Sequence, residues 1–221
     1  MRKSRRSYMP AIPRLLCVTT VALAAATLFV NVHASSAQQA ADTFVALEHL
    51  STTQLTDASA VAVSGDTAFV SSVPDGMVVV DIADPASPEI LAAVPMTGGA
   101  KDIEVKGDRA YVADSTAHDV LGTVSALLVF DISNPREPVA LSSLTTRGEG
   151  DGVEVSDDVV LWQDNPNRIH VVDTNMPPAV MGEYKFSDET LPWATDVATD
   201  GKLAYVALGW DGDRGALYVL D

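Results

Sequence analysis

The sequence predicts an all-β protein, a β-propeller built from four-stranded antiparallel blades. Three observations support this fold class. A short apolar phrase that ends in aspartate recurs four times, each repeat divides into short apolar stretches separated by turn residues, and none of the repeats has helical periodicity. The recurring aspartates are 50, 42 and 48 residues apart. A period of about 40 to 50 residues built from strands is typical of propellers and solenoids, and four strands per repeat favour the propeller.

The second repeat shows the expected order of strands, with residues 101–105, 110–113, 126–132 and 139–144. Gly107 and Asp108 follow the first strand as a hairpin turn, since both residues tolerate the backbone that tight turns need. The third strand is apolar nearly throughout, so we expect neighbouring blades to cover both of its faces. Pro135 and Pro138 then interrupt the pairing, because proline has no amide hydrogen to donate.

The other repeats have the same order of predicted strands. These strands are residues 60–63, 68–71, 77–82 and 90–94 in the first repeat, 153–155, 159–162, 168–172 and 180–184 in the third, and 196–198, 203–207 and 217–221 in the fourth. The fourth repeat lacks a fourth strand, and two interpretations are open. The chain is truncated and forms an incomplete ring, which is the interpretation we favour, or residues 44–53 complete the last blade and close a four-bladed ring. Residues 44–53 parallel residues 138–146, the fourth strand of the second repeat.

Two copies of the recurring phrase carry a family resemblance. Residues 78–88 read VVVDIADPASP and residues 128–138 read LVFDISNPREP. This pattern resembles the LVIVD repeat of exported bacterial and archaeal proteins, and the resemblance extends over residues 44 to 221. The third copy departs from it, with Thr174-Asn175-Met176-Pro177 in place of the usual ending. The resemblance implies a β-propeller at the cell surface or in the periplasm, and it brings no shared catalytic residues.

The first 37 residues have the pattern of a signal peptide. Five basic residues precede or open an apolar run of about 16 residues, and small residues follow with a cleavage site after Ala37. Arg5 and Arg6 resemble part of a twin-arginine export signal. An uncleaved anchor is the alternative, but the run is short for a membrane span. We expect residues 38–43 to be a short tether and residues 44–221 to be the propeller domain of an exported protein, without a membrane span in the mature chain.

Charge and cysteine content limit the classes of partner and the covalent links expected of the mature chain. All 30 acidic residues follow Ala37, whereas only 9 of the 14 basic ones do, so the expected mature chain has a net charge of −21. Such a surface repels nucleic acid and anionic lipid, and it suits a soluble exported protein. Cys17 is the single cysteine and lies within the apolar run, so the mature chain has no disulfide. The expected partner is a protein or a carbohydrate.

Four carboxylates are candidate cation ligands. Asp102 and Asp196 begin the first strands of their repeats, and Glu104 and Glu154 form another matched pair. First strands surround the central channel of a propeller, so these carboxylates would offer oxygen ligands to Ca²⁺ there. Gly152 and Ala60 occupy the position of Asp102 in the remaining repeats, which leaves such a ring incomplete. We therefore favour a structural role, in which these carboxylates accept backbone hydrogen bonds, and we expect no cofactor.

The remaining candidates are aromatic and structural residues. Trp193 and Trp210 are candidates for ligand binding, because both lie in loop-like positions. The phrase itself predicts structural residues that shape the turn after each third strand, namely Asp81, Pro85, Asp131, Pro135, Asp173 and Asp221. The sequence contains no Gly-x-Ser-x-Gly elbow, phosphate-binding loop or His-Glu-x-x-His motif. The favoured function is a non-enzymatic binding or scaffold module, and the alternative is a metal-dependent propeller hydrolase or lyase.

Overall fold

A computed structural model describes residues 48–118, 122–156, 159–165, 168–186, 193–209 and 215–221. The predicted signal peptide and tether lie outside these residues, as does Trp210. Every regular element in the described part is a β-strand, and residues Glu48–Asp221 form one unit. No helix in that part is long and apolar enough to cross a membrane.

The described strands follow the predicted repeats. They are β1 (Ala58–Ser64), β2 (Thr67–Ser72), β3 (Gly76–Asp81), β4 (Glu89–Val94), β5 (Ala100–Lys106), β6 (Arg109–His118), β7 (Gly122–Asp131), β8 (Val139–Arg147), β9 (Glu149–Val155), β10 (Val159–Asn165), β11 (Arg168–Asp173), β12 (Val180–Lys185), β13 (Trp193–Thr199), β14 (Ala204–Gly209) and β15 (Gly215–Leu220).

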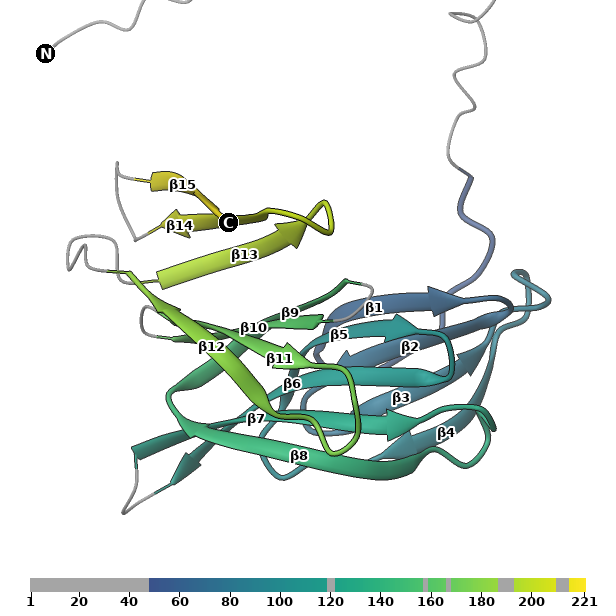
Figure 1. The fold of residues 1–221 in the computed structure, drawn as a ribbon. Helices are drawn as coiled ribbons and strands as arrows, with labels where there is room; N and C mark the ends of the chain where they lie inside the picture. The colour runs from purple at the N-terminus through teal and green to yellow at the C-terminus, as the bar shows by residue number, and fades with distance from the viewer. Residues whose placement is uncertain (1–47, 119–121, 157–158, 166–167, 187–192, 210–214) are drawn as a thin grey trace, which may run out of the picture. The chain divides into compact units, whose positions relative to one another are not determined.

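These strands form separate antiparallel sheets, one per repeat (Figure 1). The first three sheets have the orders β1-β2-β3-β4, β5-β6-β7-β8 and β9-β10-β11-β12, and the fourth is β13-β14-β15. The first strands of consecutive sheets lie beside one another, from β1 to β5, to β9 and to β13. This is the arrangement of propeller blades, with the first strand of each blade innermost. The prediction of an all-β propeller with four-stranded blades is confirmed, and in the described residues the sheets do not close into a ring.

The hydrophobic core lies between consecutive blades. Phe69 and Met77 of the first blade pack with Ile103 of the second in one buried cluster. A second cluster joins the second and third blades, and a third cluster joins the third and fourth. Val79 and Val129, in the third strands, are fully buried, as predicted for strands with a blade on either face.

The N-terminal segment lies against the first blade. Ser51 donates a hydrogen bond to the carbonyl of Pro85, the Ser72 hydroxyl donates to the carbonyl of Thr56, and Leu55 packs on the outer apolar face of that blade. Residues 48–53 form no strand, and β15 pairs only with β14 among the described strands. The alternative of a four-bladed ring closed by residues 44–53 is therefore wrong for the part of that segment that the structure describes. The physical reason is that Ser51 of this segment, and Leu55 just after it, have their partners on the first blade, whereas Leu50 stays exposed.

Candidate functional site

The two aspartates at the start of innermost strands share one local geometry. A register shift in each strand pair, at Ala100/Asp102 and at Ala194/Asp196, leaves the residue before each aspartate unpaired, whereas Asp102 pairs with Ala113 and Asp196 with Ala207. One oxygen of each carboxylate then accepts a hydrogen bond from the next residue, Ile103 at 2.9 Å and Val197 at 3.0 Å. The bulge thus places both carboxylates at equivalent positions of the second and fourth blades.

Two of the four predicted carboxylates connect neighbouring blades. The second oxygen of Asp102 accepts a hydrogen bond from the amide of Val153 at 2.9 Å, which joins β5 to β9. Glu154 of β9 accepts a hydrogen bond from the backbone of Thr199, at the end of β13. Innermost strands of different blades are not paired with one another in a sheet. The backbone amides on the unpaired side of an innermost strand therefore need other hydrogen-bond acceptors. We call Asp102 and Glu154 the inter-blade carboxylates.

The predicted carboxylates are close enough to influence one another. Burial raises the pKa of Asp102, and repulsion by Asp196 adds to this increase. Burial also raises the pKa of Glu104, followed by repulsion from Glu154 and Asp102. The pKa of Glu154 is raised by burial first and by Asp102 and Asp196 after that. The adjacent innermost strands β5, β9 and β13 therefore carry a concentrated negative potential.

The structure brings these carboxylates into electrostatic contact without gathering them around one point. Within the described ranges, no three His, Cys, Asp or Glu side chains approach closely enough to hold a metal ion. Asp196 is exposed, whereas Asp102, Glu104 and Glu154 are half-buried. Chemically, the arrangement is suited to accepting amide hydrogen bonds and to attracting diffuse positive charge.

The aspartates of the repeat phrase shape the turn that follows each third strand. Asp81, Asp131 and Asp173 each accept a hydrogen bond from the amide two residues later, at 2.9, 2.9 and 2.8 Å. Hydrogen bonds from Ser133 lower the pKa of Asp131, with a smaller contribution from Arg109. Pro85 and Pro135 lie within the turns that these bonds begin, and Asp221 directly follows β15.

Of the two tryptophan candidates, only the backbone of Trp193 is described. It begins β13 and pairs with Gly209 at one end of the fourth blade.

Sequence reasoning missed a buried polar cluster between the second and third blades. Asp164 is fully buried, and its Oδ2 accepts hydrogen bonds from Thr146 at 2.8 Å and pairs with His170 Nε2 at 3.0 Å. Arg168 approaches the same oxygen at 3.4 Å, and the ring of His170 lies 5.2 Å from that of Trp162. The turn-like sequence after Asp164 concealed this burial.

A signal for this cluster exists in the repeats. Ser72, Asp114 and Asp164 occupy the same register position of the second strand, just after the register shift, and all three are buried. Ser72 and Asp114 hold the backbone that leads into the first strand, through Thr56 and Gly99. A polar residue repeated at one position after the apolar part of the second strand thus indicates a buried backbone contact.

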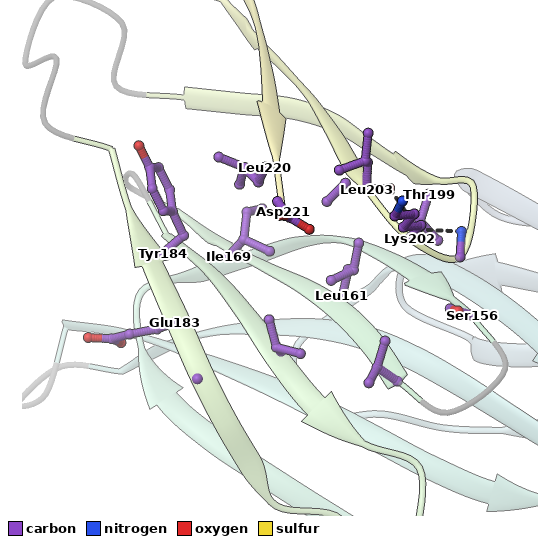
Figure 2. A pocket seen from close by; sticks show the side chains of 15 residues that line it. Ser156, Leu161, Ile169, Glu183, Tyr184, Thr199, Lys202, Leu203, Leu220 and Asp221 are labelled. Atoms are coloured by element: carbon purple, nitrogen blue, oxygen red, sulfur yellow. Dashed lines mark hydrogen bonds between the residues drawn. The ribbon is translucent and has the colours of Figure 1, made fainter.

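One pocket lies between the third and fourth blades (Figure 2). Its volume is about 360 Å³. The walls are mainly apolar and include Leu161, Ile169, Tyr184, Leu203 and Leu220. Figure 2 shows Ser156, Thr199 and Lys202 at the end of the pocket near the β13–β14 turn, and Tyr184 at the opposite side. Pockets of this size and lining are typical of small-molecule sites.

Comparisons with known proteins agree with this architecture. The fold is similar to that of the computationally designed Ika4 protein, with a TM-score of 0.59 and 11% identity over 80% of this chain and 100% of that chain. It is similar to the computationally designed Ika8 protein, with a TM-score of 0.55 and 13% identity over 74% of this chain and 45% of that chain. It is also similar to the dihydro-heme d1 dehydrogenase NirN in complex with DHE, with a TM-score of 0.51 and 20% identity over 73% of this chain and 34% of that chain. The chain thus spans less than half the length of Ika8 and of NirN. No curated protein matches the sequence significantly.

The family comparison falls on the first two blades. The model of the LVIVD repeat matches residues 56–94 and 97–146, which contain β1 to β4 and β5 to β8. Each match therefore covers one four-stranded sheet, and the phrase for which the repeat is named forms the third strand and the turn after it. Residues 56–146 thus contain two LVIVD repeats, and the described residues have a propeller-like all-β fold.

Proposed function

We propose that the chain is an exported, non-enzymatic β-propeller that serves as a binding or scaffold module in the periplasm or at the cell surface. The observation that carries this proposal is the use of the innermost carboxylates. Asp102 and Glu154 accept amide hydrogen bonds from the next blade, which suits a rigid platform. The LVIVD repeats and the basic, then apolar, N-terminal region support the same proposal.

Export is tested by expressing the full chain in a bacterial host with both export routes. We expect the periplasmic or surface fraction to contain a protein whose N-terminus, read by mass spectrometry, is Gln38. Arg5→Lys combined with Arg6→Lys should abolish export through a twin-arginine route and leave general secretion intact. A full-length protein that stays in the cytoplasm in both forms would overturn this part of the proposal.

A second candidate function is supported by the raised pKa values. Mutual repulsion among Asp102, Glu104, Glu154 and Asp196 would be relieved by a cation, as in a Ca²⁺-dependent hydrolase or lyase. Melting curves of the purified chain with EDTA and with Ca²⁺ separate the candidates. The scaffold function predicts little change in Tm. A rise of several degrees that disappears in Glu104→Gln/Glu154→Gln would favour the metal-dependent function.

A further inference from the structure

The second strand of each blade has one position that faces the next blade. Phe69, Tyr111, Leu161 and Tyr205 are equivalent in register, since each pairs with the matching residues of the first and third strands. Phe69 is buried between the first and second blades, and Tyr111 is buried between the second and third. Three of the four repeats therefore carry an aromatic ring here, and the third blade carries leucine.

The pocket lies where this ring is missing. Leu161 faces the fourth blade and belongs to the apolar cluster that joins the third and fourth blades. The same residue lines the pocket of about 360 Å³ (Figure 2). The opposite wall contributes Ala204, and the third blade's outer strand contributes Gly182, where an added Cβ would meet no atom within 4 Å. The small residues Gly182 and Ala204 thus leave a ring-sized apolar space beside Leu161.

Charge defines the end of the pocket near the β13–β14 turn. Lys202 lines the pocket there, and the ion pairs among the described residues do not involve it. Glu183 also lines the pocket, but its carboxylate lies 3.8 Å from His170 Nδ1, on the face of the third blade that meets the second blade. Asp221 is the remaining acidic residue at the pocket, and its charge opposes an anion.

We propose that this pocket binds a small molecule with an aromatic ring and an anionic head, an aryl carboxylate in its simplest form. The ring takes the place that Phe69 and Tyr111 fill at the preceding blade interfaces, and Lys202 receives the carboxylate. An apolar ligand gains by filling a preformed cavity that a side chain leaves open. This inference rests on the proposed binding function and names the ligand class of one site.

The test uses phenylacetate as the probe, in EDTA, with binding followed by NMR titration of the purified mature chain. We expect chemical-shift changes around Leu161, Gly182 and Lys202. Phenylacetate should bind about threefold more tightly than phenethyl alcohol, which is the range expected for one exposed charge pair. Phenethylamine should bind more weakly than both.

The other blades suggest a substitution that fills the pocket. Leu161→Phe restores the ring that other blades carry, so we expect an unchanged or higher Tm and a loss of phenylacetate affinity of at least about tenfold. Gly182→Val fills the same space from the outer strand, and Ser142→Val, at the equivalent place of β8, is its matched control. Lys202→Gln should remove the preference for phenylacetate over the alcohol, whereas Lys185→Gln should retain it.

Several results would overturn the inference. Undiminished binding by a folded Leu161→Phe variant would contradict the site, as would shift changes that map outside the pocket. Tighter binding of phenethylamine than of phenylacetate would contradict the anionic head. Because the test needs no metal and no export, its failure leaves the proposed scaffold function intact, and a Ca²⁺-dependent melting shift would remove that function without affecting this pocket.

Discussion

Replacing Asp102 with alanine should weaken the interface between the second and third blades. The substitution removes the acceptor for the Val153 amide and leaves that buried residue's N–H without a partner. A hydrogen bond to a charged group contributes about 1.5 to 3 kcal/mol. The loss is offset in part because burial and Asp196 disfavour the charged form of Asp102. We therefore expect the free energy of unfolding to fall by about 1 to 2 kcal/mol.

Asp196→Ala is the matched control. Asp196 has the same bulge and the same bond to the following amide, but it is exposed, and no hydrogen bond between described residues joins it to another innermost strand. Urea unfolding measured by circular dichroism gives both free energies from the midpoint and the m-value. The control should lose less than about 0.5 kcal/mol. Equal losses in the two variants would refute the reasoning, because the inter-blade bond would then contribute nothing.

Three further results are expected. The pKa values of Asp102, Glu104 and Glu154 are raised above their ordinary values of 3.8 for Asp and 4.5 for Glu, so the folded state binds more protons than the unfolded state. The stability that these groups contribute should therefore fall as pH rises through that range. The urea midpoint measured from pH 4 to 7 should decline, and it should decline less steeply in Glu104→Gln. Glu104→Gln should also raise stability at neutral pH, by less than about 1 kcal/mol since the side chain is partly exposed; an unchanged or lower midpoint would contradict this sign. Gly150→Ala should destabilise the fold by about 1 to 3 kcal/mol, because its Cβ would lie 2.5 Å from Ser125 Oγ, whereas Gly65→Ala, with open space but a positive φ, tests backbone strain alone.

The repeat could be predicted from the sequence because its signals are local. Turn residues such as Gly107 and Pro135 punctuate each blade, and apolar third strands identify the elements buried on both sides. The predicted strands therefore agree with the observed ones, apart from their ends. The N-terminal segment was harder, since its similarity to residues 138–146 suggested a blade strand, and only its contacts with Pro85 and the first blade reveal another place for it.

The site was only partly predictable, because it depends on which blade each side chain faces. The positions of Asp102 and Glu154 on innermost strands followed from the repeat. Their bonds to Val153 and Thr199 did not, because contacts between blades have no spacing in the sequence. The sequence analysis did not single out Leu161, whose equivalence to Phe69, Tyr111 and Tyr205 follows from the observed strand register. The position became informative because the equivalent residues Phe69 and Tyr111 are buried between blades.

Hydrogen exchange at two backbone amides tests the central claim most directly. The inter-blade carboxylates should protect the amides of Val153 and Thr199, although neither bond belongs to a sheet ladder. Exchange followed by NMR should be at least about tenfold slower at both amides than in an unfolded chain. Asp102→Ala should remove the protection of Val153 and leave that of Thr199. Exchange of both amides at the unfolded rate in the native protein would contradict the account.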